Sequence, residues 1–246
     1  MVRLDYRLVL VKDKLTSLKK TYVVLSSKGG VGKSTLSSLL AFYAAERGIR
    51  VGLIDLDFTN PSTHIVLGVD PREVRYVEEK GIIPALVGKL SYVTPATFTR
   101  DSPLPLRGES VSRALFELIS ILRLDGLKYL FIDTPPGMSD EHMDIIYGLG
   151  EVVKPVVVTT PSPLSVSSVR KMISLLRESG LREILLVENM GEGGLVDVFK
   201  EPGVTYLGYV PFYPGFDNCI GSLENVRNCP LRGFFEKIVD RLVSGD

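Results

Sequence analysis

The chain has 246 residues, of which 45% are hydrophobic, and it carries 29 Lys or Arg residues against 29 Asp or Glu residues. This length and composition predict one domain with a full hydrophobic core, and the formal net charge of +0 argues against a strongly basic nucleic-acid-binding protein. Since no apolar run approaches the about 20 residues that span a bilayer, and the N-terminus lacks a signal-peptide pattern, we expect a cytoplasmic protein without a transmembrane segment.

Residues 1–20 precede the first predicted core strand. Tyr6, Leu8 and Leu10 alternate with other residues, and several lysines follow them. Alternation with a period of two is typical of a strand. We therefore expect an N-terminal arm or a short strand over residues 1–20, with a partly ordered tail as the alternative.

A glycine-rich segment follows the apolar strand predicted over residues 22–25 and precedes an apolar helix expected from Ser34 to about Gly48. Its sequence is Lys28-Gly29-Gly30-Val31-Gly32-Lys33-Ser34-Thr35. This is K-G-G-x-G-K-[ST], the deviant Walker A motif, in which Ser27 stands where the common form has its first glycine. The glycines let the turn point its amides inward, toward an anion. An ordinary glycine-rich turn is the alternative, but the strand, the helix, both lysines and the Ser-Thr pair are all present.

This motif predicts a role for each residue of the segment. The amides of residues 29–33 would wrap a β-phosphate at the N-terminus of the helix, where the helix dipole favours negative charge. Lys33 would reach the β- and γ-phosphates as a catalytic residue, Ser34 would ligate Mg²⁺, and Thr35 would contact the α-phosphate. The predicted nucleotide-binding residues of the loop are Gly29, Gly30, Val31, Gly32, Lys33, Ser34 and Thr35.

Two acidic residues follow the second predicted strand, over residues 50–54. Carboxylates at the carboxyl end of a parallel strand lie where open α/β sheets bind ligands. We predict that Asp57 orients the attacking water and lies at the metal, and that Asp55 supports the Mg²⁺ shell. A turn or helix-cap role is the alternative for either residue.

The stretch of residues 70–107 is rich in Pro and Gly, and it predicts short strands near residues 81–83 and 90–93 within a mobile segment rather than a separate domain. Apolar residues at helical spacing then predict a crossover helix over residues 109–123.

The third core strand, over residues 127–133, ends in an acid, as in a Walker B motif. Asp133 would hold Mg²⁺ through water, because this ion keeps much of its hydration. The following Gly137 is predicted to sense a γ-phosphate with its amide, as switch segments do. His142 has no partner pattern that would make it a base, and a surface helix position is the simpler interpretation.

Later strands are predicted over residues 156–160, 184–187 and 206–210, with a helix over residues 164–179 between the first two. Asn189 follows one of these strands and could bond a purine edge, and Pro211 follows another. Strands that alternate with helices predict an α/β fold, a P-loop NTPase three-layer sandwich with a mostly parallel central sheet. We expect residues 21–246 to form this single P-loop ATPase domain.

These residues together resemble the deviant Walker A ATPases of the MinD/ParA/Mrp superfamily, and most closely its Mrp branch. The resemblance covers about residues 20–215 and includes, besides the loop, Asp55-Leu56-Asp57 with Pro61-Ser62, Leu106-Arg107-Gly108, Ile132-Asp133-Thr134-Pro135-Pro136-Gly137 with Asp140-Glu141-His142, and Val187-Glu188-Asn189-Met190. It implies a slow, Mg-dependent ATPase that forms a homodimer with ATP between the subunits. Lys28 would be a catalytic lysine that reaches the partner's phosphates, and Asn189 with the Pro211 region would hold adenine.

The two cysteines depart from the Mrp pattern, which places a C-x-x-C pair after the Glu-Asn-Met strand. Here that stretch has no cysteine, and Cys219 and Cys229 lie too far apart in sequence to replace the motif. We expect two buried or incidental reduced thiols. The alternative is an unusual metal or iron-sulfur cluster site that bridges a dimer.

The last predicted helix has an apolar face, as the membrane-targeting helices of MinD-type relatives do. Its polar face mixes acids and bases without a cationic excess, so we favour core packing.

The leading functional hypothesis is an Mrp-type ATP switch in iron-sulfur or metal-cofactor handling, with an unknown client protein. A MinD- or ParA-like positioning ATPase on membrane or DNA is the alternative, and a phosphoryl-transferring biosynthetic enzyme is a third possibility for which no acceptor pocket is evident.

Overall fold

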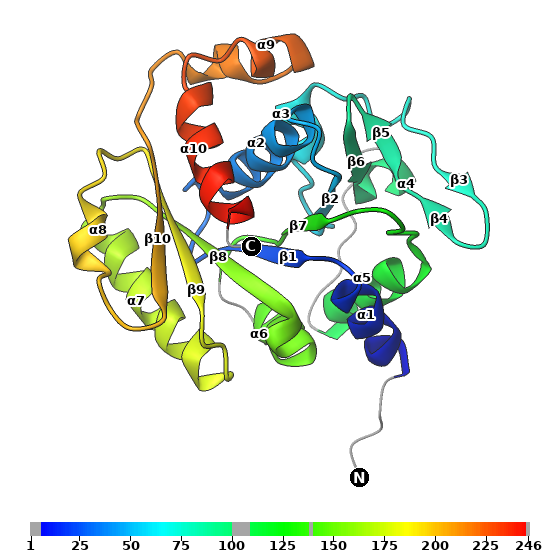
Figure 1. The fold of residues 1–246 in the computed structure, drawn as a ribbon, viewed down its shortest axis with the longest axis horizontal. Helices are drawn as coiled ribbons and strands as arrows, with labels where there is room; N and C mark the ends of the chain where they lie inside the picture. Colours follow the sequence, from blue (N-terminus) through cyan, green and yellow to red (C-terminus); the bar gives the residue numbers. More distant parts are fainter. Residues whose placement is uncertain (1–5, 100–108, 138–139, 245–246) are drawn as a thin grey trace.

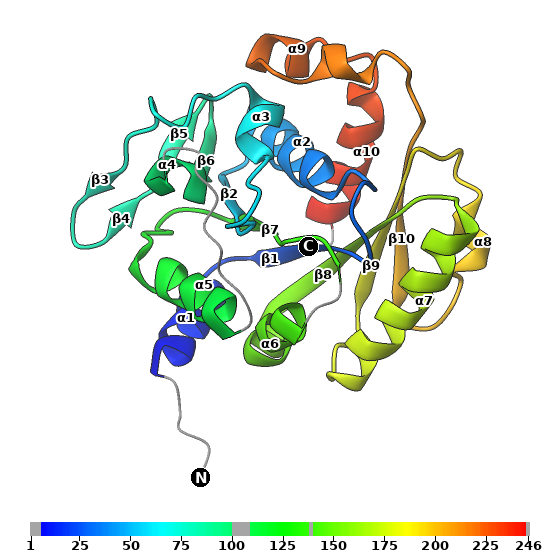
Figure 2. The same cartoon turned by 180° about the vertical axis from the view of Figure 1, so that it is seen from behind.

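The computed structural model describes residues 6–99, 109–137 and 140–244. These residues form three layers, a central β-sheet with helices on both of its faces (Figure 1 and Figure 2). Within them, no helix is both long enough and apolar enough to cross a bilayer. The α/β fold class and the layered arrangement predicted from the sequence are confirmed.

The main sheet has eight strands in the order β10-β9-β8-β1-β7-β2-β6-β5. All neighbours pair in parallel except β5 and β6, which pair antiparallel at one edge. Its strands are β1 (Lys20–Ser26), β2 (Val51–Asp55), β5 (Ala85–Val87), β6 (Leu90–Val93), β7 (Tyr129–Asp133), β8 (Val153–Thr159), β9 (Ile184–Asn189) and β10 (Val204–Val210). The central strands are buried along their whole length, which is why they were recognisable as continuous apolar runs.

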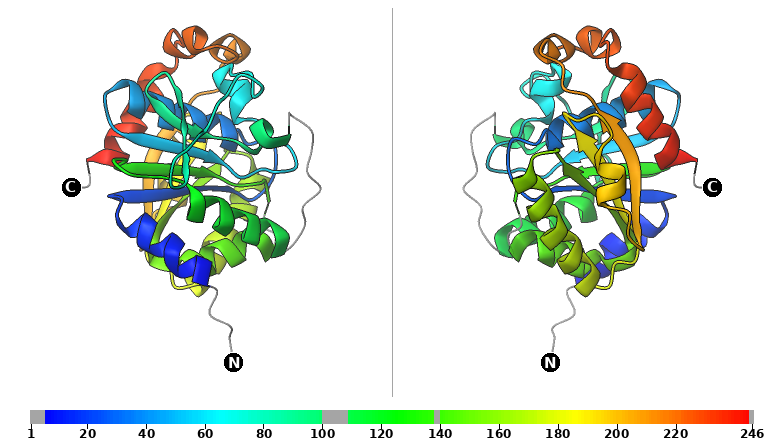
Figure 3. Two further views of the ribbon diagram at one scale, coloured as in Figure 1. Left: turned by 90° about the vertical axis from the view of Figure 1, so that its right-hand side faces the viewer. Right: turned by 90° about the vertical axis from the view of Figure 1, so that its left-hand side faces the viewer.

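One face of the sheet is covered by α2, α3, α9 and α10, and the other by α1, α5, α6 and α7 (Figure 3). The first group comprises α2 (Lys33–Glu46), α3 (Thr63–Leu67), α9 (Leu223–Arg227) and α10 (Arg232–Val243). The second group comprises α1 (Tyr6–Thr16), α5 (Glu109–Ile121), α6 (Asp140–Leu149) and α7 (Pro163–Glu178). The described residues also contain two short helices, α4 (Pro95–Thr99) and α8 (Leu195–Val198), and two 3₁₀ turns, η1 (Gly150–Val152) and η2 (Phe216–Cys219).

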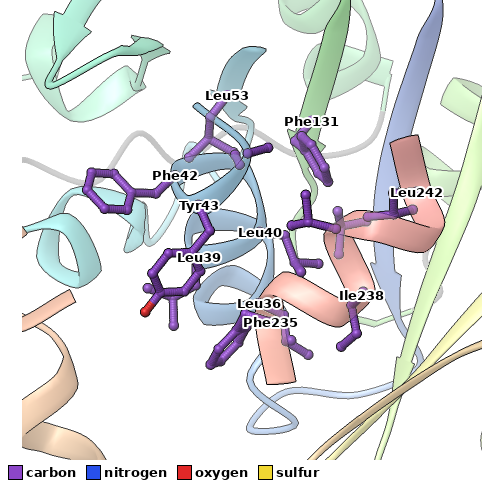
Figure 4. Packing of buried hydrophobic residues seen from close by; sticks show 14 of the residues in the cluster. Leu36, Leu39, Leu40, Phe42, Tyr43, Leu53, Phe131, Phe235, Ile238 and Leu242 are labelled. Atoms are coloured by element: carbon purple, nitrogen blue, oxygen red, sulfur yellow. The ribbon is translucent and has the colours of Figure 1, made fainter. Parts of the chain in front are cut away.

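The C-terminal helix packs against the helix that follows the glycine-rich loop. Figure 4 shows Leu36 and Leu40 on the side of α2 that faces α10, with Phe235 and Leu242 opposite them. The Tyr22 hydroxyl of β1 also donates a hydrogen bond of 2.6 Å to the Leu242 carbonyl. The apolar face of α10 is therefore part of the core, as predicted, and is not available as a membrane anchor.

The start of the chain differs from the prediction. Tyr6–Thr16 is a helix and not a strand or an arm. Val11 and Leu15, one helical turn apart, are buried in the core. The Lys14 Nζ donates to the carbonyls of Ile119 and Leu122, at 3.3 and 2.7 Å, and also to that of Ser120. These contacts cap the end of α5 and attach α1 to the domain, so the short alternation of apolar residues was a misleading signal.

The Pro- and Gly-rich stretch contains the strands predicted near residues 81–83 and 90–93, as β4 (Ile82–Ile83) and β6. It also contains three elements that were not predicted, namely β5, α4 and β3 (Val77–Glu78), which pairs antiparallel with β4. The predicted crossover helix is confirmed as α5. The Leu106-Arg107-Gly108 motif lies outside the described residues, as do the side chains of Asp140, Glu141 and His142.

Candidate nucleotide-binding site

The glycine-rich loop joins the end of β1 to the start of α2. Gly30 and Gly32 have φ angles of 79° and 83°, a left-handed conformation that residues with a Cβ rarely adopt. A Cβ on Gly32 would lie 2.3 Å from the Asn189 Nδ2 atom. That amide nitrogen donates a hydrogen bond of 2.8 Å to the Val31 carbonyl, so the end of β9 braces the loop.

A cavity of about 330 Å³ lies over this loop. It is lined by residues 28–35 together with Asp57, Asn60, Ser62 and Pro136, among others. The lining therefore combines loop amides, two lysines and hydroxyl groups, which are the groups that bind a polyphosphate. The structure thus brings the predicted loop and Asp57 together around one space.

Lys33 and Asp133 form a buried ion pair beside this cavity. The Lys33 Nζ lies 2.7 Å from Asp133 Oδ1, and the two side chains are 5% and 0% exposed. The Lys33 Nζ also donates to the Ser34 hydroxyl at 3.0 Å, and the Ser37 hydroxyl donates to the same Asp133 oxygen at 2.9 Å. Ser37 was not predicted, although its place one turn after Lys33 on the same face of α2 could have indicated it.

The second carboxylate oxygen of Asp133 is buried and has no hydrogen-bond partner among the described residues. A buried carboxylate oxygen without a donor is energetically costly. A hydrated cation would satisfy it, and Mg²⁺ is usually held by one or two carboxylates together with phosphate oxygens and water. The described residues contain no group of three or more acidic, His or Cys side chains that could hold a metal alone. Asp133 and Ser34 therefore suit a magnesium ion that arrives with a nucleotide.

Asp55 is fully buried, and its carboxylate acts as a cap for the loop after β2. Its Oδ1 accepts from the Asp57 amide at 3.0 Å, and its Oδ2 accepts from the Thr63 amide and hydroxyl at 3.2 and 2.7 Å. Burial, followed by the charge of Asp133 opposite it in the sheet, raises the pKa of Asp55 to about 7. The cap alternative is therefore the one observed, and a supporting role for Asp55 at the Mg²⁺ shell stays a prediction.

Asp57 lines the cavity and is 6% exposed. Its Oδ1 accepts a hydrogen bond of 2.8 Å from the Asn60 amide, which holds the carboxylate in place. A carboxylate fixed at the wall of a phosphate-binding cavity can orient a water molecule.

Gly137 lies just after β7, at the end of β1. Its amide donates to the Ser26 carbonyl at 3.1 Å, so it is already paired at the end of β1 and does not point freely toward a phosphate. The γ-phosphate-sensing role of Gly137 stays a prediction, and it requires this hydrogen bond to break when a nucleotide binds.

A second cavity, of about 280 Å³, adjoins the first, and Gly32 and Thr35 line both. Asn189 and Pro211 lie on its wall, as predicted for a base-binding pocket. The aromatic residues Phe212, Tyr213 and Phe216, which were not predicted, line it as well. Their concentration directly after β10 was a signal for a stacking surface that could have been used. A purine contact by Asn189 stays a prediction.

Glu188 organises the loop after β9, where the C-x-x-C motif was sought. Its buried carboxylate accepts from the amides of Glu192, Gly193 and Leu195 at 3.1, 3.2 and 3.0 Å, and from the Tyr206 hydroxyl at 2.8 Å. Burial and this hydrogen bond raise the pKa of the Tyr206 hydroxyl above its ordinary range. The loop is thus built around a carboxylate and not around thiolates.

The two cysteines form a disulfide, Cys219–Cys229, with their Cα atoms 4.7 Å apart. The prediction of two reduced thiols is wrong, because the turn formed by η2 and α9 returns the chain on itself and buries both residues. The alternative of a metal or cluster site is not seen either, since both sulfur atoms are used in the bond.

Comparisons with known proteins agree with this geometry. The model of a ParA family, described as NUBPL iron-transfer P-loop NTPase, matches residues 17–230. The "Cytosolic Fe-S cluster assembly factor Nubp2 homolog" of Drosophila simulans is 36% identical over 86% of this chain and 90% of its own length. The "Cytosolic Fe-S cluster assembly factor NBP35" of Kluyveromyces lactis is 34% identical over 90% of this chain and 74% of its own length.

Two solved structures share the fold. A nucleotide-binding protein from Archaeoglobus fulgidus, in complex with ADP, has a TM-score of 0.69 and 24% identity, over 95% of this chain and 93% of that one. The cell division ATPase MinD of Pyrococcus furiosus has a TM-score of 0.68 and 23% identity, over 92% of this chain and 99% of that one.

Proposed function

The chain belongs to the ParA family of P-loop NTPases, in its NUBPL iron-transfer form, and on this premise we propose that it is a Mg-dependent ATPase of Mrp type that acts as a switch in iron-sulfur cluster assembly. One observation carries the ATPase half of the proposal. The Lys33 Nζ lies 2.7 Å from Asp133 Oδ1 and 3.0 Å from the Ser34 hydroxyl, beside a cavity that could hold phosphates and that adjoins a second cavity suited to a base.

The ion pair supports a switch in which Lys33 changes its partner. Without a ligand, Lys33 neutralises Asp133 in a buried environment. When a nucleotide fills the cavity, the phosphates become the partner of Lys33, and Asp133 becomes available with Ser34 as a magnesium ligand. A bound Mg²⁺ would neutralise phosphate charge and orient the γ-phosphate. Asp57 would then hold the attacking water.

Lys28 supports a dimeric site. It lines the phosphate cavity, yet it lies at the front of the loop and is only half-buried. We expect it to act on the phosphates of a second subunit, so that hydrolysis is slow until two copies enclose ATP. The homodimer, the slow rate and this role of Lys28 are parts of the proposal.

The iron-sulfur half of the proposal rests on the family and on relatives whose names describe cytosolic Fe-S cluster assembly factors. We extend the cytosolic location to this chain. Its cysteines are paired with each other, so a cluster would be held with ligands from a client protein. The positioning alternative is not favoured, because the face of α10 that could bind a membrane is buried against α2.

The test has two arms. Phosphate release from ATP should require Mg²⁺ and stop in EDTA, and a chain that releases none in either condition contradicts the ATPase. In the second arm, the chain is reconstituted anaerobically with iron and sulfide, together with an apo iron-sulfur protein, and the iron and labile sulfide transferred to that client are measured with and without ATP. No ATP-dependent transfer would remove the iron-sulfur half and leave the ATPase.

A further inference from the structure

The segment between β10 and α10 both forms a wall of the base pocket and contains the disulfide. Pro211, Phe212, Tyr213 and Phe216 line the pocket. The 3₁₀ turn η2 begins at Phe216 and ends at Cys219, and Cys229 lies two residues after the end of α9. The disulfide therefore joins the pocket wall to α9.

The α9 side of this link is attached to α2. The Tyr43 hydroxyl of α2 donates a hydrogen bond of 2.6 Å to the Val226 carbonyl. The Arg227 Nε lies 2.9 Å from Glu46 Oε2, and its guanidinium group lies 5.7 Å from the centre of the Phe42 ring. Because α2 begins at Lys33 of the phosphate-binding loop, α9 is fixed to the element that carries that loop.

The pocket wall, residues 211–218, makes fewer polar contacts with the rest of the domain than α9 does. The Phe216 amide donates to the Tyr213 carbonyl and the Asn218 amide to the Gly215 carbonyl, both at 3.1 Å. Within the part of the chain that the structure describes, no backbone–backbone hydrogen bond joins residues 211–218 to α2, α9 or α10, and the nearest side-chain bond from α9, that of Asn225 Nδ2, reaches the Ile220 carbonyl beyond Cys219. Apolar packing of Tyr213 and Phe216 and the disulfide remain to position this wall.

We propose that the Cys219–Cys229 pair is a redox-sensitive site that sets the affinity of the base pocket for a nucleotide. The closed disulfide holds the pocket wall against α9, so a nucleotide binds a preformed pocket and less conformational entropy is lost on binding. After reduction, residues 211–218 lose their covalent cross-link to α9 and keep only the apolar packing of Tyr213 and Phe216 and the intervening chain, whose Ile220 carbonyl accepts from Asn225 Nδ2 at 2.8 Å. The nucleotide must then supply more of the ordering of this wall. This inference rests on the proposed nucleotide-binding function.

Reduction by a dithiol proceeds in two exchange steps. A thiolate of the reductant attacks one cysteine sulfur, the Cys219–Cys229 bond breaks, and the second cysteine leaves as a thiolate. The other thiol of the reductant then attacks the mixed disulfide, so the reductant becomes a cyclic disulfide. Two electrons and two protons pass from the reductant to the protein, which ends with two thiols.

Burial couples this exchange to the ligand. Cys219 is 0% and Cys229 4% exposed, so a reductant must wait for the segment to open locally. A nucleotide bound against Phe216 would oppose that opening. Because coupling between two sites is reciprocal, a disulfide that favours nucleotide binding is itself protected by the nucleotide.

The experiment compares the full chain in two redox forms. The chain is oxidised in air or reduced anaerobically with dithiothreitol, the thiols are counted by alkylation and mass spectrometry, and binding of ADP and of inorganic pyrophosphate is measured by calorimetry. We expect the oxidised form to bind ADP about fivefold or more tightly than the reduced form, with pyrophosphate affinity unchanged within about twofold. ADP should also slow the reduction.

The matched control is the double variant Cys219→Ala/Cys229→Ala, which should bind ADP like the reduced chain whether or not dithiothreitol is present. If it does not fold, the two forms of the unaltered chain decide. An ADP affinity that differs by less than about fivefold between them, or cysteines that stay as thiols after oxidation in air, would overturn the inference. A chain that binds ADP in neither form contradicts the proposed function instead.

Discussion

At the scale of single residues, the site depends on how Lys33 and Asp133 share a buried space. Burying either charge without a partner of opposite charge would cost free energy, and in this structure the two side chains pair with each other. The orphan oxygen of Asp133 shows that the pairing is incomplete. In the proposed switch, a magnesium nucleotide would offer a phosphate to the lysine and a cation to the carboxylate, so the exchange of partners would leave neither charge alone.

The two lysines of the loop should respond differently to removal. Lys33→Ala deletes the buried cation, and we expect ATP affinity to fall about 10- to 100-fold, the loss of one charged hydrogen-bonding group. Lys28→Ala should leave affinity within about threefold and abolish hydrolysis, because we place its contact in a second subunit. Fluorescent-nucleotide titration and phosphate release measure the two effects. Equal loss of affinity in both variants would argue against the trans role of Lys28.

Asp55 predicts how stability depends on pH. Its pKa is raised from the ordinary 3.8 to about 7, first by burial and then by Asp133. Between these values the folded chain keeps a proton that the unfolded chain releases, so the free energy of unfolding should fall as pH rises toward 7. The slope is at most about 1.4 kcal/mol per pH unit.

Urea unfolding of the nucleotide-free chain in EDTA, from pH 5 to 8, measures this dependence. The variant Asp55→Asn has no titrating group at this position and serves as the control. In this variant the free energy of unfolding should depend much less on pH. An unchanged dependence would assign the titration to another group.

At the scale of elements, the fold was largely predictable because the central strands are buried runs that end in distinctive residues. β1, β2 and β7 were recognisable from the loop, Asp55 and Asp133 that follow or end them. The features that the sequence did not reveal depend on contacts between residues that lie far apart in the chain. The alternation of Tyr6, Leu8 and Leu10 suggested a strand, whereas the segment is a helix that packs on the core through Val11 and Leu15. No local pattern shows that Cys219 and Cys229 form a disulfide. The bond from the Gly137 amide to the Ser26 carbonyl at the end of β1 was likewise not visible in the sequence.

The packing of α10 on the core can be measured with a matched pair of leucines. Leu242 is 2% exposed on α10, whereas Leu164 is 75% exposed at the start of α7. Leu242→Ala should lower the free energy of unfolding by about 2 to 5 kcal/mol, because it leaves a cavity. Leu164→Ala should change it by no more than about 0.5 kcal/mol. Equal effects in guanidinium unfolding would show that α10 is not part of the cooperative core.

At the scale of the whole molecule, the proposed switch needs a second copy of the chain. The variant Asp57→Ala should bind ATP but not hydrolyse it, because it lacks the carboxylate that we place at the attacking water. We therefore expect a dimer in multi-angle light scattering with ATP and Mg²⁺, and a monomer with ADP. A variant that stays monomeric with ATP at every protein concentration would contradict the dimeric site and leave the single-subunit nucleotide pocket intact.

The central claim is that three strand ends converge on one magnesium-bound triphosphate. A crystal structure with a non-hydrolysable ATP analogue and Mg²⁺ tests it most directly. We predict phosphates against the amides of residues 29–35, Lys33 released from Asp133 onto them, the ion between Ser34 and Asp133, and the base beside Pro211. A nucleotide bound elsewhere, or a Lys33–Asp133 pair that remains closed with the loop empty, would contradict the account.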